Sequence, residues 1–361
     1  MTREPASTLS AVTCGCLTPV LLATTLLALS PCACSQNSDV RNIPARTLPT
    51  PTTVSPAMQA EISKSWDGST KPEHLTTQQW KAQIQKENEP EAASVDPMLK
   101  QFHVSLQQSK IAGVPVFLLK PETIAPQNRN RVLLHVHGGG YVVFAGKAAT
   151  PEGILMAHYG QIEVISIDYR MPPDFPFPAA VDDAVAVWKE VIRTHAPASV
   201  GLFGTSAGGG LTLATVLRLK ELHLPLPGAL MAGTPWTDLS ETGDSYFTNE
   251  YVDNVLGSYR GSLEADAKLY AGSHNLKEPL LSPIYGDVSG FPPTILLSGT
   301  RDLFLSNTVR MHQKLLQAHV RANLLVFEGQ SHAQYLIVDD APESADAFHE
   351  VAAFFDQNLA K

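Results

Sequence analysis

The chain has 361 residues and a net charge of −9, with 17% charged and 44% hydrophobic residues. The hydrophobic fraction is enough for a sizeable core, which excludes a disordered or coiled-coil chain. The acidic balance and the lack of a Lys/Arg cluster exclude nucleic acid as a partner. All four cysteines lie between Cys14 and Cys34, so the rest of the chain can form neither a disulfide nor a cysteine-ligated metal site.

Residues 1–35 are predicted to be an export signal, so the protein is expected to be periplasmic or secreted. The run Leu17–Leu29 is apolar apart from its threonines, and Ala33-Cys34-Ser35 resembles a cleavage site. A second interpretation is a lipoprotein signal with Cys32 lipidated, which would tether the protein to a membrane, although a proline precedes that cysteine. An uncleaved anchor ranks third, since the run is shorter than the roughly 20 residues that span a bilayer. A disordered cytosolic tail would not explain the leucines.

Residues 36–57 are rich in Pro, Thr and Ser and predict a linker, with one α/β domain over 58–361. Strands are expected at Val114–Leu119, Arg131–Val136, Ile162–Ile167, Val200–Gly204, Ala229–Ala232, Thr294–Ser298 and Asn323–Phe327. Helices are expected at Ala179–His195, Ser206–Leu219, Thr308–Ala318 and Glu343–Phe355. Strands that alternate with helices predict a mostly parallel central sheet with helices on both faces.

Two segments do not fit this alternation. Residues 58–100 contain helical stretches (Ala57–Lys64 and Thr76–Glu87) broken by Gly and Pro, and residues 244–276 indicate helices rich in Tyr and Phe. We expect both to form a helical cap over the active edge of the sheet. The alternative is peripheral decoration.

The first chemical motif is Gly204-Thr205-Ser206-Ala207-Gly208, a G-x-S-x-G between a strand and a helix. In that context the serine lies on a tight turn that lifts its hydroxyl above the sheet at a helix N-terminus. Side chains at the flanking glycines would collide with the neighbouring strand and helix. A bare G-x-S-x-G is more often an ordinary turn, but the strand before it and the helix after it favour a nucleophile at Ser206.

The second motif, His137-Gly138-Gly139-Gly140-Tyr141, directly follows a strand. Its glycines expose backbone N–H groups that can bind an oxyanion together with the N–H of Ala207. A phosphate loop is a weaker interpretation, because no Gly-Lys-Ser/Thr follows. His135 and His137 face one way on the strand, as metal ligands do, but no third ligand is evident and no metal is expected.

An acid and a base follow two later strands. Asp302 comes after an apolar strand and His332 after the next one, at the strand ends where α/β sheets carry their sites. Ser, Asp and His in this order match the α/β-hydrolase arrangement, with His332 as base and Asp302 as its orienting acid. Glu328 and Asp339 are rival acids.

At this point the chain resembles the bacterial hormone-sensitive-lipase-like (family IV) carboxylesterases of the α/β-hydrolase fold, from about Val114 to the C-terminus. The resemblance rests on HGGGY at 137–141, IDYRMPPDFPFPAAVDD at 167–183, GTSAGG at 204–209, PWTDLS at 235–240, SP at 282–283, RD at 301–302 and SH at 331–332. Thr205 stands where most members have Asp, and the LFLSN loop after Asp302 departs from the usual Asp-Pro-Leu. Both features resemble a GTSAG-motif subgroup.

The resemblance implies a serine esterase for short- to medium-chain esters that needs no cofactor and is often dimeric. It implies a triad of Ser206, Asp302 and His332, and an oxyanion hole from Gly138, Gly139 and Gly140, chiefly the last two, with Ala207. Tyr141 and Trp236 are expected either to line the substrate pocket or to be core, and the Asp182-Asp183 pair to be structural. A lactone hydrolase, an exported O-deacetylase and a non-catalytic protein that binds a hydrophobic ligand stay as alternatives.

Overall fold

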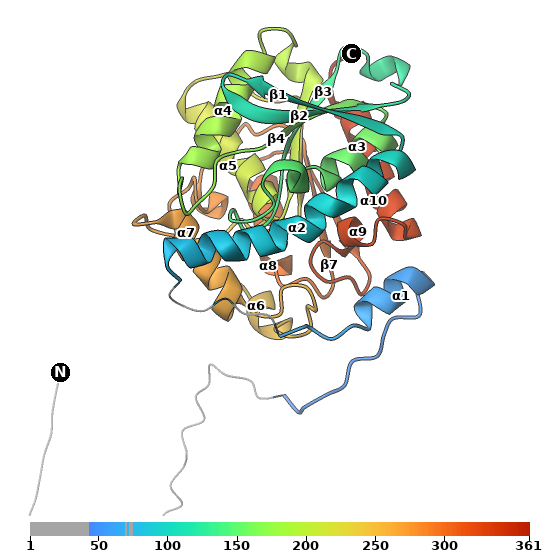
Figure 1. Ribbon diagram of the computed structural model, residues 1–361, viewed down its shortest axis with the longest axis vertical. Coiled ribbons are helices and arrows are strands. Elements are labelled where there is room, and N and C mark those ends of the chain that lie inside the picture. The colour runs from blue at the N-terminus through green and yellow to red at the C-terminus, as the bar shows by residue number, and fades with distance from the viewer. Residues whose placement is uncertain (1–42, 69–70, 72–74) are drawn as a thin grey trace, which may run out of the picture. The chain divides into compact units, whose positions relative to one another are not determined.

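An eight-stranded sheet organises the part of the chain that the structure describes, residues 43–68, 71 and 75–361 of a computed structural model (Figure 1). Along the sheet the strands follow the order β1-β2-β4-β3-β5-β6-β7-β8. The strands are β1 Val104–Ile111, β2 Val114–Pro121, β3 Val132–Val136, β4 Glu163–Ile167, β5 Val200–Thr205, β6 Ala229–Gly233, β7 Thr294–Gly299 and β8 Ala322–Phe327. From β4 to β8 every pairing is parallel, whereas β2 is antiparallel to both of its neighbours.

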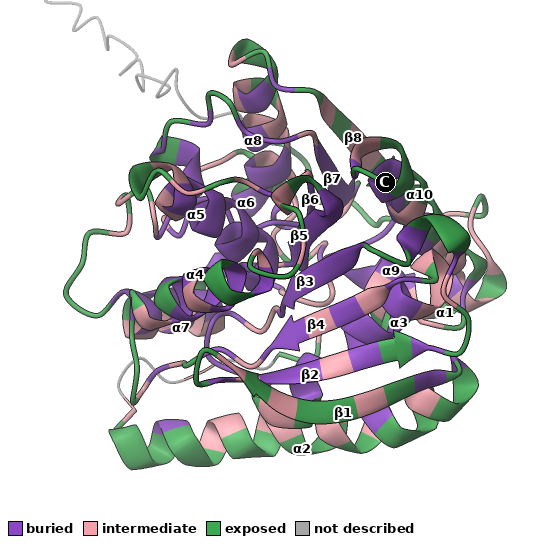
Figure 2. Cartoon of the chain, turned by 90° about the horizontal axis from the view of Figure 1, so that it is seen from above, coloured by how far each residue is buried: buried purple, intermediate pink, exposed green. Residues whose placement is uncertain are grey.

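Helices cover both faces of the sheet (Figure 2). Leu134 of β3 packs in the cluster with α4 (Ala179–Val191), α5 (Ala207–Glu221) and α8 (Leu305–Gln317). Its neighbour Leu133 belongs to the opposite cluster, with α3 (Pro151–Gly160) and α10 (Pro342–Asn358). Because successive side chains of a strand point to opposite faces, the apolar run of β3 is buried on both sides. This is the predicted α/β-hydrolase architecture.

The first hairpin of the sheet was not predicted from the sequence. β1 alternates exposed and partly buried residues at the sheet edge, so it lacks the apolar run that indicates a buried strand. It turns into β2 through Ala112 and Gly113, which both have positive φ (50° and 84°). Two such residues form the tight turn that sets the hairpin register.

The two segments expected as a cap lie together. The first contains α1 (Pro56–Ile62) and α2 (Thr77–Gln101), and the second contains α6 (Ser245–Thr248), a π-helical turn at Tyr259–Leu263 and α7 (Glu264–Ala271). Trp80 of α2 shares a small apolar cluster with Ala265 and Leu269 of the second segment. The structure therefore joins the two segments across about 190 residues of sequence, as the ion pair from Lys71 to Asp266 also does.

The helix expected over Thr76–Glu87 continues to Gln101 through Pro90 and Pro97. A proline inside a helix removes one backbone N–H, which frees the carbonyl four residues earlier. Both prolines and the residues with the freed carbonyls, Lys86 and Ala93, are exposed, so water can satisfy those carbonyls. The two prolines therefore do not end α2.

The predicted signal, residues 1–35, and the start of the predicted linker lie outside the described residues. The linker was expected to reach residue 57, but residues from Pro49 onward belong to the compact domain. Ser55 caps α1 and donates its hydroxyl to Glu343 of α10 at 2.7 Å. These contacts correct the end of the linker, because the segment before α1 is attached to the domain.

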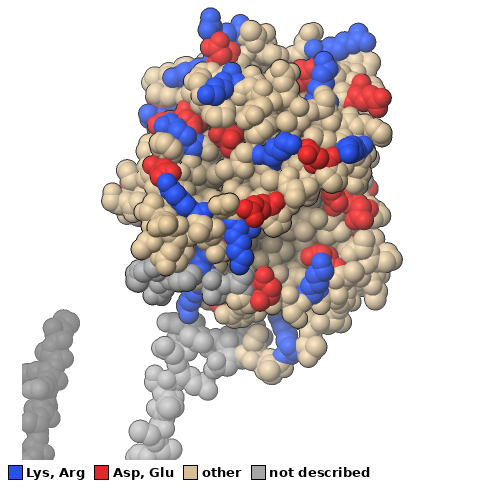
Figure 3. Space-filling model, viewed as in Figure 1, with Lys and Arg blue, Asp and Glu red and all other residues tan. Residues whose placement is uncertain are grey.

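The described surface carries charges of both signs. Figure 3 shows basic and acidic side chains interspersed over one face of the molecule. Exposed ion pairs such as Lys81–Asp174 and Lys147–Asp96 contribute little to stability, because water screens them. Among the described residues, no helix has the length and hydropathy needed to cross a membrane.

Candidate active site

Ser206 lies in a tight turn between β5 and α5. Its backbone, at φ 64° and ψ −126°, adopts a conformation that a non-glycine residue holds only when its surroundings impose it. A Cβ atom at Gly204 or Gly208 would overlap the carbonyl oxygen of Val136 on β3. Both flanking positions therefore require glycine, and the turn has the predicted strand–serine–helix geometry with Ser206 at the start of α5.

Asp302 and His332 meet at the carboxyl edge of the sheet, after β7 and β8. The Nδ1 atom of His332 lies 3.0 Å from Oδ1 of Asp302, and both side chains are buried. Two further donors fix the carboxylate: the Ser298 hydroxyl at 2.6 Å from Oδ2 and the Phe304 N–H at 2.8 Å from Oδ1. Because the carboxylate accepts, we assign the proton of the neutral imidazole to Nδ1.

The other nitrogen of His332 faces no protein partner. Nε2 is buried and has no hydrogen bond within the described part of the chain. His332 and Ser206 line the same cavity. Nε2 therefore carries a free lone pair, as a base that takes the serine proton must.

The rival acids do not contact His332. Glu328 is exposed and makes no hydrogen bond to the imidazole, whose Nδ1 is bonded to Asp302. Asp339 lines the cavity, where burial and then the charge of Asp340 raise its pKa, yet it makes no bond to His332. Asp302 is thus the acid that the structure brings to the base.

The glycine loop 138–140 lies against the nucleophile turn. A Cβ at Gly138 would be 2.9 Å from the Thr205 carbonyl oxygen and 3.3 Å from Cβ of Ser206. Gly139 and Gly140 have φ of 95° and 62°, which side chains disfavour. None of the described residues accepts a hydrogen bond from the N–H groups of these glycines or of Ala207. Free donors beside the serine are what an oxyanion hole requires.

His137 contacts this glycine loop and the Tyr169 ring. Its ring stacks on Tyr169 with centroids 4.1 Å apart, and Nδ1 donates to the Gly138 carbonyl at 2.9 Å. Burial lowers the pKa of His137 to about 3, so the ring is neutral. His135 instead contacts Glu152 and Ser166, and the described residues contain no group of three or more His, Cys, Asp or Glu that could hold a metal ion.

A cavity of about 610 Å³ opens above the serine. Its lining includes the glycine loop, Ser206, His332 and residues of both cap segments. Cap residues in this lining are Trp66, Lys71, Glu87, Glu91, Ser94, Met98, Val255, Leu256, Ser262, Leu263 and Asp266. Both segments therefore contribute residues to the lining of this cavity.

Within the cavity wall, Lys71 and Asp266 form a buried ion pair. Nζ of Lys71 lies 2.9 Å from both carboxylate oxygens of Asp266. Burial raises the pKa of Asp266 to about 7, against the opposing effect of Lys71. Only 8% of the Lys71 side chain and 6% of the Asp266 side chain are exposed. The pair links the two cap segments next to the glycine loop.

Tyr141 and Trp236 are core residues, which corrects their assignment to the substrate pocket. Neither lines the cavity, and both are fully buried. Tyr141 stacks on Tyr270 with centroids 3.9 Å apart, and Trp236 stacks on Phe304 at 5.3 Å. Phe304 in turn meets the His332 ring edge-on at 4.9 Å, so Trp236 supports the base from behind.

Of the Asp182-Asp183 pair, Asp183 has a structural partner. Its carboxylate accepts from the backbone N–H and the guanidinium of Arg170, both at 2.8 Å. Asp182 is exposed. This geometry agrees with the structural interpretation of the pair.

Glu152 of α3 was missed by the sequence reasoning. Its carboxylate is buried beneath the nucleophile turn and accepts from the hydroxyl and the N–H of Thr205 at 2.6 Å and 3.1 Å. Nε2 of His135 lies 3.0 Å from the same carboxylate. The only signal in the sequence was an acid inside an otherwise apolar helical segment.

The fold and this arrangement of Ser, Asp, His and free N–H donors define an α/β-hydrolase. Residues 133–336 match the model of a family described as alpha/beta hydrolase fold. A crystal structure of an esterase, E25, shares 41% identity with a TM-score of 0.84, over 89% of this chain and 99% of that one. An esterase of the bacterial hormone-sensitive lipase family shares 27% identity with a TM-score of 0.75, over 85% and 99%. An acetyl-hydrolase of Streptomyces hygroscopicus is 29% identical over 64% of this chain and 78% of its own.

The chain therefore belongs to the α/β-hydrolase family and, within it, to the hormone-sensitive-lipase-like carboxylesterases. It is a serine hydrolase that acts on carboxylic esters.

Proposed function

We propose that Ser206, His332 and Asp302 are the catalytic triad of this carboxylesterase, and that its substrates are short- to medium-chain esters. The observation that carries the proposal is the Asp302–His332 pair, whose Nε2 has no partner among the described residues and whose imidazole shares one cavity with Ser206 and the glycine loop 138–140. The serine hydroxyl is a weak nucleophile unless a base removes its proton.

In the first half of the reaction, Oγ of Ser206 attacks the ester carbonyl carbon while its proton passes to Nε2 of His332. The carbonyl oxygen becomes an oxyanion that the N–H groups of Gly139, Gly140 and Ala207 bind. The bond to the alkoxy group then breaks, and His332 returns the proton so that the alcohol leaves. An acyl group stays on Ser206.

In the second half, water attacks the acyl carbon and His332 takes its proton. The second tetrahedral intermediate collapses, the carboxylic acid leaves, and the proton returns to Oγ of Ser206. Asp302 stays ionised throughout, keeps the imidazole in the Nδ1–H tautomer and stabilises the imidazolium. The 610 Å³ of the cavity holds an acyl chain of modest length, which supports the chain-length preference.

The test is hydrolysis of p-nitrophenyl esters from acetate to palmitate by the protein and by its Ser206→Ala variant. We expect a maximum at short or medium chains, and loss of activity in the variant on the order of 10⁴-fold or more. Labelling by a fluorophosphonate, which requires the active serine, should vanish in the same variant. Activity that survives Ser206→Ala would refute the proposed nucleophile.

We further propose that the protein is exported through residues 1–35 and forms a homodimer. The apolar run Leu17–Leu29 supports export, and the family resemblance supports the dimer. Fractionation of cells that express the protein, with and without Cys32→Ser, separates the soluble exported form from a lipid-tethered one. Sedimentation of the purified protein measures its oligomeric state.

A further inference from the structure

Asp253 is a buried carboxylate beside the Asp302–His332 pair. It lies in the second cap segment, has no exposed surface, and takes part in none of the ion pairs with Lys or Arg among the described residues. Instead it accepts four hydrogen bonds from backbone N–H groups. Oδ1 accepts from Val255 at 2.9 Å and from Leu256 at 3.0 Å, both in its own turn.

The other oxygen of Asp253 joins the two loops that carry the acid and the base. Oδ2 accepts from the N–H of Leu303, the residue after Asp302, at 2.7 Å, and from the N–H of His332 at 3.2 Å. One oxygen atom therefore ties the Asp302 loop to the His332 loop. A shift of either loop by a fraction of an ångström would break one of these bonds.

A neutral hydrogen-bond acceptor in place of the Asp253 carboxylate would cost less free energy on folding. Burial and the charge of Asp302 raise the pKa of Asp253 to about 6, with His332 and the N–H groups of Leu256 and Leu303 opposing the rise. Ionising a second acid next to Asp302 works against folding. A side chain that serves packing alone would not need that charge.

Asn254 extends the link to the first cap segment. Its Nδ2 donates to the carbonyls of Glu61 at 2.8 Å and Lys64 at 3.0 Å, where α1 ends. Its Oδ1 accepts from Gln334 at 3.0 Å, two residues after His332. Asp253 and Asn254 together thus connect both cap segments to the loops of the triad.

We propose that Asp253 is a positioning residue that fixes the Asp302 loop and the His332 loop relative to each other. Asn254 makes this relative position of the two loops depend on α1 of the cap. The inference rests on the proposed triad. It assigns to the cap a role in catalysis beyond shaping the cavity. Displacing a reacting group by about 1 Å can cost on the order of 100-fold in rate, so small loop shifts are enough for a measurable effect.

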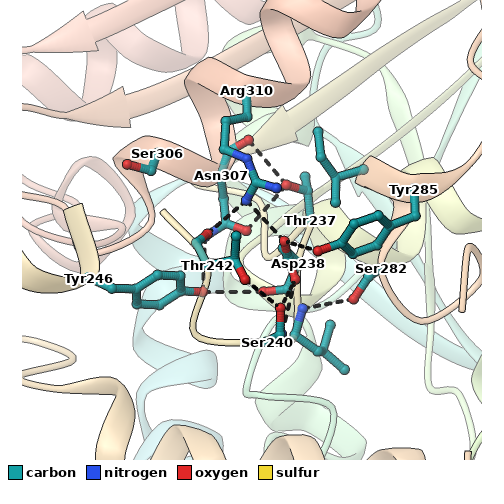
Figure 4. A network of polar contacts seen from close by, with 12 residues as sticks. Thr237, Asp238, Ser240, Thr242, Tyr246, Ser282, Tyr285, Ser306, Asn307 and Arg310 are labelled. Atoms are coloured by element: carbon teal, nitrogen blue, oxygen red, sulfur yellow. Dashed lines mark hydrogen bonds and ion pairs between the residues drawn. The ribbon is translucent and has the colours of Figure 1, made fainter. Parts of the chain in front are cut away.

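The test compares Asp253→Asn with a matched control, Asp238→Asn. Asn keeps the size of Asp but puts an NH₂ group against one pair of N–H donors. Asp238 is also a fully buried carboxylate that joins separate loops, since it accepts from Arg310 at 3.0 Å and Tyr285 at 2.9 Å (Figure 4). It lies outside the triad, so Asp238→Asn should lower Tm without a selective loss of kcat.

For Asp253→Asn we expect kcat to fall by about tenfold to 100-fold while KM changes by less than about threefold. The rate of fluorophosphonate labelling should fall in parallel, and the low-field proton resonance of His332 Nδ1–H should shift or broaden. Asn254→Ala removes only the link to α1 and Gln334, so it should cause a smaller fall in kcat with the same unchanged KM.

Three outcomes would overturn the inference. The first is an unchanged kcat in Asp253→Asn, and the second is a fall in kcat that is proportional to the fall in Tm to the same extent in Asp253→Asn and in Asp238→Asn. The third is a His332 Nδ1–H resonance that neither shifts nor broadens in Asp253→Asn. If Asp253→Asn does not fold, Asn254→Ala decides, and an unchanged kcat there overturns the proposal. Activity that survives Ser206→Ala would instead refute the proposed triad, and this outcome is distinguishable from the three above.

Discussion

The hydroxyl of Thr205 donates to Oε1 of Glu152 at 2.6 Å, directly beneath the turn that carries Ser206. The same hydroxyl lies 2.7 Å from the Tyr335 hydroxyl, three residues after His332. All three side chains are buried. Thr205 therefore connects the nucleophile turn, α3 and the loop of the base.

Thr205→Val should weaken both the fold and catalysis. Valine keeps the shape but leaves Oε1 of Glu152 without this donor, and an unsatisfied buried polar group costs about 1–3 kcal/mol. The strained Ser206 turn loses its support, so we expect kcat to fall by roughly tenfold. Denaturant unfolding and p-nitrophenyl ester kinetics measure the two effects. Thr212→Val is the control, because the buried Thr212 hydroxyl has no hydrogen-bond partner among the described residues and its removal should be neutral or stabilising.

Gly139→Ala should damage the oxyanion hole. The added Cβ would overlap the Val143 carbonyl oxygen and lie 2.7 Å from the Phe144 ring, at a φ of +95°. The loop must move, and loss of an oxyanion donor typically lowers kcat on the order of 100-fold to 1,000-fold. Gly113→Ala has a similar φ of +84° in the β1–β2 turn but meets no atom within 4 Å, so it should cost about 1–2 kcal/mol of stability and leave kcat unchanged. Equal kcat in the two variants would contradict the assignment of the loop.

Asp302→Asn should nearly abolish activity, whereas Glu328→Gln should not. The amide of asparagine cannot hold the His332 tautomer that leaves Nε2 free to accept a proton, and the corresponding change in serine proteases costs about 10⁴-fold in kcat. Glu328 is exposed and makes no contact with His332. A steady-state assay of both variants against the parent protein decides between the two acids, and a large loss in Glu328→Gln would reverse the assignment.

The sequence predicted the parallel part of the sheet and the three triad candidates, because each follows from a local pattern. Apolar runs such as VLLHV at 132–136 indicate strands buried on both faces, and Ser206, Asp302 and His332 each follow such a strand. The edge strand β1 has no such run. Asp253 could not be found in this way, since a single acid in the second cap segment has no local signature. Its function arises only when the chain brings it to Leu303 and His332.

The positions of Tyr141 and Trp236 could not be predicted from local sequence patterns either. Tyr141 directly follows the glycine loop, and Trp236 belongs to the PWTDLS motif at 235–240. Their rings nevertheless pack into the core, against Tyr270 and Phe304. An aromatic residue next to a motif carries no information on which side of the loop its ring lies.

Asp266 should make the stability of the cap depend on pH. Its pKa is about 7 in the fold against the ordinary value of 3.8, so between about pH 4 and pH 7 the folded chain keeps a proton that the unfolded chain releases. Its contribution to the free energy of unfolding is therefore largest at low pH and falls as pH rises to about 7. Asp266→Asn removes this pH-dependent contribution. The wild type should therefore lose stability relative to the variant as the pH rises from 5 to 8. Thermal unfolding of the wild type and the variant at pH 5 and at pH 8 measures this change. The same difference in Tm between the two proteins at both pH values would contradict the prediction.

The effect of Asp253→Asn on catalysis should itself depend on pH. Asp253, which faces Asp302 and His332, is ionised above its pKa of about 6 and protonated below it. The ionised form offers two acceptor oxygens to its four N–H donors and places a negative charge beside the imidazolium that forms on His332 during the reaction. The protonated form, like asparagine, has one donor group and a single good acceptor and carries no charge. We therefore expect the ratio of wild-type to variant kcat to be largest above pH 7 and to decrease as pH falls through about 6, in kcat–pH profiles recorded on both proteins. A ratio that stays constant from pH 5 to pH 8 would mean that the charge of Asp253 has no part in positioning or stabilising His332.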